Sequence, residues 1–196
     1  MTRWALISDE HSQTRIDCVL DMIRRLQEQG VSIGGFVQRR LEKTDGPGGF
    51  ELTRLSQGHE RVTLAQKPAV GGVAVDDAAC DYVFESTAFE CALTWIEEDA
   101  RRCDLVVLDV ISKMETYGHG HARSLRRALE LAAAKVVLIG ARASELNAIV
   151  DEFQLDLDAV VSYLELPVSN ADRDRFVREV AEACRTKGER RRSSVA

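Results

Sequence analysis

The sequence lacks the features that mark membrane, secreted and zinc-knuckle proteins. No apolar run in its 196 residues approaches the roughly 18 residues of a membrane-spanning helix, so no membrane span is expected. The chain does not open on a charged segment followed by an apolar one, as a secretory leader does. Its five cysteines form no CxxC pair, which argues against a zinc knuckle and a disulfide framework. We therefore expect a cytoplasmic protein.

The sequence also lacks an excess of basic residues outside its last segment. The formal net charge is −6, and the segment 187–192 alone holds four basic residues and one acidic residue, which leaves −9 for the rest of the chain. An acidic body repels nucleic-acid backbones, so no nucleic-acid partner is expected. The last residues, 188–196, are interpreted as a disordered basic tail, with docking on an acidic protein partner as the alternative.

What the sequence does contain is an alternation of two apolar patterns. Short, nearly continuous apolar runs predict buried parallel strands, and apolar residues at helical spacing lie between them. Strands that alternate with helices predict an α/β fold, a three-layer sandwich with a mostly parallel central sheet. The predicted strands cover residues 4–7, 31–37, 105–108, 136–139 and 159–161.

Five helices are predicted between and after these strands. Gly30 is expected to end the first helix, Thr87 and Glu90 to form a capping box at the second, and Asn170 to cap the last. The helices are identified by apolar residues at helical spacing within 16–26, 89–100, 125–133, 146–153 and 176–184.

The stretch 39–77 breaks this alternation. It shows no helical period, and its segments 50–55 and 61–64 predict a β-hairpin across the turn at 56–58. The stretch is too short and too poor in apolar residues for a core of its own. We therefore expect a single domain over residues 1–187, with 39–77 as a β insertion at one edge of the sheet.

Three loops are expected to share one rim of this sheet. Ligands of open α/β sheets bind beyond the carboxyl ends of the strands, and the loops 8–15, 109–121 and 141–144 each follow a predicted strand. Asp109 closes one strand, the arrangement that holds Mg²⁺ beside a bound triphosphate, although it could instead cap the following turn. Such a site also needs the glycine-rich loop G-x-x-x-x-G-K-[ST]. The loop 8–15 has no glycine and no lysine, and it carries Asp9 and Glu10.

Three segments then occur in an order seen in small nucleoside-triphosphatases. They are GFVQ at 35–38, GFEL at 49–52 and DLVVLDVISKME at 104–115. Over roughly residues 4–153, the chain resembles the phosphate-loop family first described from thermophiles, whose strand-end signature is D-E-I-G-x-M-E. It is most similar to an uncharacterised bacterial branch with a degenerate phosphate loop, sometimes linked to molybdenum transport.

The resemblance implies roles for particular residues. Asp109 would organise Mg²⁺ if a nucleotide binds, but the general base falls on Val110, and the phosphate lysine falls near Thr14 or Arg15. Phosphoryl transfer depends on positioning and charge neutralisation, so these losses should lower the rate by many powers of ten. We expect a non-catalytic ligand-binding or regulatory module. Its expected ligand-binding residues are Ser8, Ser12, Thr14, Arg15, Asp109, Lys113 and Glu115.

Two other functions stay open at this stage. One is an active nucleoside-triphosphatase that converts NTP to NDP with Mg²⁺. The other is a protein that binds a metal or a molybdate-type oxyanion. Glycine-flanked His119 and His121 could hold one ion, with Asp109, Glu115 or His11 completing the set, and the molybdenum link of the resembling branch favours an oxyanion. Lys113 could hold an anion or pair with Glu115 at the surface. The expected partner is a small anion, a nucleotide-like molecule or another protein.

Overall fold

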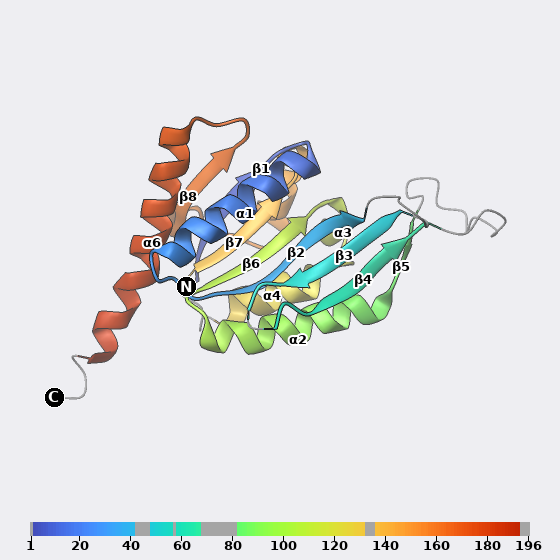
Figure 1. The fold of residues 1–196 in the computed structure, drawn as a ribbon, viewed down its shortest axis with the longest axis horizontal. Coiled ribbons are helices and arrows are strands. Elements are labelled where there is room, and N and C mark those ends of the chain that lie inside the picture. Colours follow the sequence, from blue (N-terminus) through green and yellow to red (C-terminus); the bar gives the residue numbers. More distant parts are fainter. Residues whose placement is uncertain (1, 42–47, 57, 68–81, 132–135, 193–196) are drawn as a thin grey trace.

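The computed structural model describes residues 2–41, 48–56, 58–67, 82–131 and 136–192. Within these residues, eight strands form one sheet in the order β5-β4-β3-β2-β6-β7-β1-β8 (Figure 1). The elements are β1 (Arg3–Ser8), α1 (Ser12–Glu28), β2 (Ile33–Leu41), β3 (Gly49–Arg54), β4 (Arg61–Gln66), β5 (Val83–Phe84), α2 (Ser86–Arg102), β6 (Leu105–Ile111), α3 (Lys113–Thr116), α4 (Ala122–Leu131), β7 (Val136–Ala141), α5 (Leu146–Glu152), β8 (Val160–Glu165) and α6 (Asn170–Arg192), with short 3-10 turns at Ala143–Glu145 and Leu157–Ala159.

Five of the strands are parallel and confirm the predicted α/β fold. β6 pairs with β2 on one side and β7 on the other, and β1 pairs with β7 and β8, all in parallel register. β6 and β7 are covered on both faces, and their sequences are accordingly nearly continuous apolar runs. The carboxyl ends of β1, β6 and β7 therefore meet at one edge, which is the rim expected from the sequence.

The predicted hairpin is also present, and it extends the sheet on the other side of β2. β2 pairs antiparallel with β3, β3 with β4, and β4 with β5. β2 is long enough to take part in both halves, since Phe36 and Val37 pair with both β6 and β3. Parts of the stretch 39–77, namely 42–47, 57 and 68–77, lie outside the described residues.

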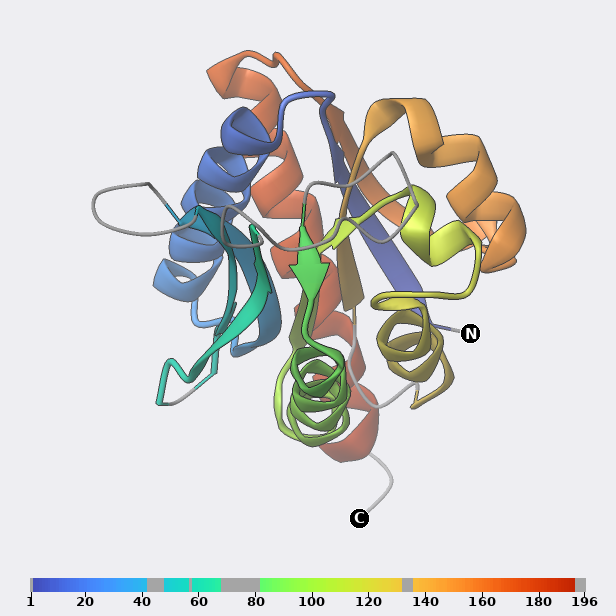
Figure 2. The same ribbon diagram turned by 90° about the vertical axis from the view of Figure 1, so that its right-hand side faces the viewer.

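Helices cover the sheet on both faces, which completes the three layers (Figure 2). α1 and α6 pack on one face, where Val19, Met22 and Phe176 are buried in one apolar core. α2, α4 and α5 pack on the other face, in a second core that includes Ile96 and Leu125. None of the helices within the described residues has the length and apolar character that crossing a membrane requires.

The helix ends differ in part from the sequence predictions. Gly30 follows α1 with a φ of +80°, as a helix-ending glycine does. The capping box predicted at Thr87 is wrong, because α2 already begins at Ser86 and its N-cap, Glu85, makes no side-chain cap bond. Asn170 is the first residue of α6, and the cap bond comes from Ser169, whose Oγ accepts from the Asp172 amide at 3.2 Å.

The carboxyl-terminal helix reaches further along the chain than the boundary expected at residue 187. α6 runs to Arg192, so its backbone is helical at 188–192. Residues 193–196 of the expected basic tail, and Ala133 of the predicted third helix, lie outside the described residues.

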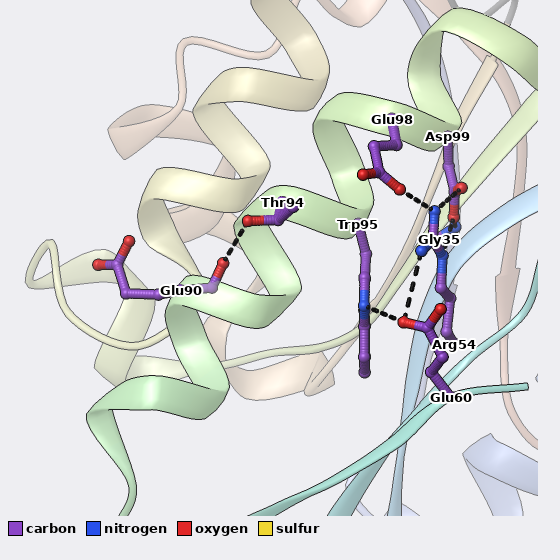
Figure 3. A network of polar contacts seen from close by, with 8 residues as sticks. All are labelled: Gly35, Arg54, Glu60, Glu90, Thr94, Trp95, Glu98 and Asp99. Carbon is purple, nitrogen blue, oxygen red and sulfur yellow. Dashed lines mark hydrogen bonds and ion pairs between the residues drawn. The ribbon is translucent and has the colours of Figure 1, made fainter.

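A polar network fastens α2 to the sheet (Figure 3). Asp99 of α2 accepts hydrogen bonds from the Gly35 amide at 2.8 Å and from Arg54 Nη2 at 2.6 Å. A Cβ at Gly34 would overlap the Asp99 side chain, so glycine at this position lets the carboxylate reach β2. Since Asp99 is buried and fully bonded, the network is structural, and it fixes the helix that borders the site described next.

Candidate functional site

A pocket of about 470 Å³ opens at the carboxyl ends of β2 and β6. The start of α1, the hairpin strands, the start of α2 and the loop after β6 supply its walls. Its polar lining residues are Gln13, Arg15, Gln38, Arg40, Ser112, Glu115, His121 and Arg142.

Arg15 and Asp109 form a buried ion pair beside this pocket. Arg15 Nε donates a hydrogen bond to Asp109 Oδ1 at 2.7 Å, and the side chains are 3% and 0% exposed. Asp109 lies opposite Gly140 in the register of β6 and β7, and a Cβ at Gly140 would overlap Asp109 Oδ1. Burial raises the pKa of Asp109, while the charge and hydrogen bond of Arg15 act in the opposite direction. Arg15 is therefore the counter-charge of the buried Asp109 carboxylate.

The residues at this position do not fit a Mg²⁺ ion. Mg²⁺ takes several oxygen ligands in octahedral geometry, but Oδ1 of Asp109 already accepts from a guanidinium, Oδ2 is its one oxygen without a partner among the described residues, and Val110 offers no side-chain oxygen. A divalent cation on this carboxylate would also meet the positive charge of Arg15 at close range in a dry environment. No step that uses Mg²⁺ follows from this arrangement.

The loop between β1 and α1 bonds its own acids to backbone amides. Asp9 Oδ1 accepts from the His11 amide at 3.0 Å, and Glu10 Oε1 accepts from the Ser144 amide at 2.6 Å. A phosphate loop instead presents its amides to phosphate oxygens at the start of the helix. Here the carboxylate of Asp9 takes the place of such an anion at the His11 amide, and Glu10 bonds across to the loop after β7.

Glu115 is the second buried acid of the site. Its Oε2 accepts from the Ser112 amide at 2.8 Å, and its Oε1 accepts from the His121 amide at 3.0 Å. Gly120 has a φ of +56°, and a Cβ there would overlap Glu115 Oε1. Burial raises the pKa of Glu115, and the amide hydrogen bonds oppose that rise. The alternative of a surface pair between Lys113 and Glu115 is wrong, because Glu115 is buried.

His121 lies deep in the pocket wall. Its ring centroid is 4.5 Å from that of Phe36 and 4.9 Å from that of Phe89, and the residue is 2% exposed. Burial lowers the pKa of His121 to about 3, so the imidazole is neutral at ordinary pH. Neither ring nitrogen has a hydrogen-bond partner among the residues that the structure describes.

The structure brings together only part of the set expected from the sequence. Arg15 and Glu115 line the pocket, and Asp109 lies behind Arg15. Ser8 is fully buried, with its Oγ 3.1 Å from the hydroxyl of Tyr163. Thr14 and Lys113 are exposed and do not line the pocket, and the side chain of Ser12 lies outside the described part of the structure.

The expected metal ligands are likewise separated. His119 is exposed, whereas His121 is buried between two aromatic rings. In the described ranges, no group of three or more His, Cys, Asp or Glu side chains is arranged to hold a metal ion. The structure therefore does not gather Asp109, His119 and His121 into one coordination sphere.

Several pocket residues were not expected from the sequence. An aromatic wall comes from Phe50 of β3, Phe84 of β5 and Phe89 of α2, and two further cations come from Arg40 and Arg142. The position of Arg142 could have been predicted, since the loop 141–144 was expected at the rim. No sequence pattern predicts the aromatic wall, because its residues come from elements that meet only when the hairpin and α2 pack together.

Comparisons with known proteins agree with this fold. The model of the family described as NTPase matches residues 13–181, a range that begins after β1 and most of the loop that follows it. Nucleoside-triphosphatase THEP1 of Methanopyrus kandleri is 26% identical over 165 residues, which is 80% of this chain and 83% of that protein.

Two solved structures are similar over almost the whole chain. A human cancer-related nucleoside triphosphatase superposes with a TM-score of 0.66 and 18% identity, over 95% of this chain and 98% of that one. THEP1 from the hyperthermophile Aquifex aeolicus gives a TM-score of 0.61 and 17% identity, over 94% and 99%. At these identities the likeness establishes a shared fold.

Proposed function

This chain belongs to the NTPase family, and we propose that it works within that family as a ligand-binding or regulatory module that does not hydrolyse nucleoside triphosphates. The fold brings the first loop and the end of β6 to one rim, as a nucleotide hydrolase requires. The residues at that rim disfavour phosphoryl transfer.

One observation carries this proposal. The acid at the end of β6, Asp109, is bonded at 2.7 Å to Arg15 of the chain itself. Phosphoryl transfer needs that acid for a metal ion and needs a free cation for the phosphates. In this protein each of the two neutralises the other, and both are buried.

The loop chemistry supports the same proposal. Lysine and glycine are absent from residues 8–15, and Asp9 and Glu10 place two negative charges where a triphosphate would approach. The dipole of α1 still favours an anion, but these acids cancel much of that attraction. We expect ATP and GTP to bind with millimolar affinity or weaker, on the order of −4 kcal/mol.

An active nucleoside-triphosphatase is the competing function. It is favoured by the names of the relatives, since Nucleoside-triphosphatase THEP1 of Methanopyrus kandleri and the human cancer-related nucleoside triphosphatase both carry that activity in their names. Magnesium-dependent phosphate release from ATP or GTP separates this function from a binding module.

Calorimetry tests the proposed role. We would titrate the full chain with ATP and GTP in the presence of Mg²⁺, and separately with Mg²⁺, Zn²⁺ and molybdate, the oxyanion suggested by the sequence resemblance. We expect millimolar or weaker binding of the two nucleotides and no binding of Mg²⁺ alone. Micromolar binding of a triphosphate that disappears in Arg15→Ala would contradict the proposal, whereas micromolar Zn²⁺ or molybdate binding would make that ion the ligand.

A further inference from the structure

The two ring nitrogens of His121 lack a hydrogen-bond partner in the described residues, although the side chain is almost completely buried. Buried polar atoms in folded proteins are nearly always hydrogen-bonded, and leaving one unpaired is costly. His121 also lines the pocket. Because a neutral imidazole has one donor and one acceptor, it can bond a ligand that carries either group.

The walls around His121 suit a flat apolar ring. Phe50 and Tyr82 lie with ring centroids 4.9 Å apart, and Phe84 stacks on Phe89 at 6.1 Å. All four side chains line the same pocket as His121. Aromatic walls with a few placed polar groups are typical of sites for small planar ligands, and about 470 Å³ is enough for a two-ring compound.

The charged groups of the pocket favour an anion. Arg15, Arg40 and Arg142 line it, and Arg15 Nη1 is buried without a partner among the described residues. Glu115 is the one carboxylate in the described lining, and both its oxygens accept from backbone amides. A negative group on the ligand would therefore meet Arg40 and Arg142, while Arg15, whose charge Asp109 balances, offers the hydrogen bond of its Nη1.

We propose that this pocket binds an anionic, planar nitrogen heterocycle, whose ring packs on the aromatic wall, whose ring nitrogen bonds to His121, and whose negative group lies near Arg15, Arg40 and Arg142. The inference rests on the proposed ligand-binding role. It places the ligand beside the Arg15–Asp109 pair and leaves that pair intact, with Gln13 and Arg15 of the loop 8–15 in the pocket lining.

Matched probes test the hydrogen bond to His121. Quinoline-3-carboxylate and 2-naphthoate have the same shape and charge, but only the first has a ring nitrogen. By calorimetry on the full chain, we expect quinoline-3-carboxylate to bind about tenfold more tightly, the factor that corresponds to about 1.4 kcal/mol. Equal affinities, or no binding of either compound, would overturn the proposal.

Two variants at neighbouring histidines locate that preference. In His121→Phe the ring and its packing are kept while both nitrogens are lost, so the ratio of the two affinities should fall to about one. His119→Phe, the same change at an exposed position two residues away, should keep the tenfold ratio. A ratio that survives in a folded His121→Phe protein, checked by its melting temperature, would overturn the assignment.

The charge preference is tested in the same way. The neutral quinoline-3-carboxamide should bind about tenfold more weakly than the carboxylate, and Arg40→Gln should reduce this difference. Arg39→Gln is the control, since Arg39 is an exposed neighbour that does not line the pocket. A carboxamide that binds as tightly as the carboxylate would contradict an anionic ligand.

Failure of this inference can be told from failure of the proposed function. Phosphate release from ATP would overturn the binding-module role whatever the quinoline-to-naphthoate ratio is. A ratio of one in a protein that releases no phosphate would overturn the heterocycle site alone.

Discussion

Arg15 Nε, on the first turn of α1, donates a hydrogen bond to Asp109 Oδ1 at the carboxyl end of β6, across 2.7 Å. The two residues are 94 positions apart in the sequence and are buried together. The acid that would organise a metal ion in a nucleotide hydrolase is thereby bonded to a cation of the same chain. This relationship underlies the proposed function.

Breaking the pair on one side should be strongly destabilising. Asp109→Asn keeps the shape of the side chain but leaves the Arg15 charge buried without a counter-charge, which typically costs about 3 kcal/mol or more of the free energy of unfolding. Urea unfolding measures this loss. The double replacement Arg15→Met with Asp109→Leu removes both charges and should be more stable than Asp109→Asn, since apolar replacements of buried pairs are often neutral.

An exposed ion pair provides the control for this experiment. Arg24 and Glu28 pair on the surface of α1 at 2.7 Å, with more than half of each side chain exposed. Arg24→Ala should give no measurable loss of the free energy of unfolding, because solvent screens such pairs.

The buried pair is tested by the double variant. If the variant changed at both Arg15 and Asp109 is less stable than Asp109→Asn, the pair itself holds the fold together.

Stability should also depend on pH through His121. Burial lowers its pKa from the ordinary value of 6.5 to about 3, so between these values the unfolded chain binds a proton that the folded chain does not. The free energy of unfolding should therefore fall as the pH drops from about 6.5 towards 3, by up to about 1.4 kcal/mol per pH unit. Chemical denaturation at several pH values measures this slope.

The contribution of His121 is isolated by comparing variants. His121→Phe should flatten the slope relative to the unaltered protein, because phenylalanine takes up no proton in either state. His119→Phe should keep it, since His119 is exposed. Equal slopes in all three proteins would mean that His121 is hydrated or bonded in the folded state.

Two glycines of one loop allow a test of the Glu115 geometry. Gly118 and Gly120 both have positive φ, at +81° and +56°, so alanine strains the backbone at either position. Only at Gly120 would the new Cβ overlap Glu115 Oε1, while nothing lies within 4 Å of a Cβ at Gly118. Gly120→Ala should lower the free energy of unfolding by about 1–3 kcal/mol more than Gly118→Ala. Equal losses would show that Glu115 shifts freely.

The fold could be predicted from the sequence because its signals are local. The apolar runs that form β6 and β7 are continuous, as strands buried on both faces must be. The hairpin could be predicted from the turn residues that separate its two strands. The helix caps were harder to predict from the sequence. Thr87 and Glu90 have the spacing of a capping box, but Thr87 lies one residue inside a helix that begins at Ser86.

The site was predictable only in outline. Asp109 could be found as an acid at a strand end, but its pairing with Arg15 depends on how α1 docks on the sheet. His121 was considered as a metal ligand, and its burial between Phe36 and Phe89 follows from the packing of β2 and α2 around the loop. Contacts of this kind arise between distant segments, so no local pattern records them.

Phosphate release is the most direct measurement of the central claim, that the Arg15–Asp109 pair occupies the acid and the cation that phosphoryl transfer would need. The purified full chain would be incubated with ATP or GTP and Mg²⁺, beside a sample with chelator and a folded Asp109→Asn sample. We predict that all three release phosphate at the same background rate, because Asp109 is bonded to Arg15, the loop 8–15 has no lysine, and Val110 stands where the general base would fall. Turnover that requires Mg²⁺ and is lost in Asp109→Asn would contradict the account and make the protein an active nucleoside-triphosphatase.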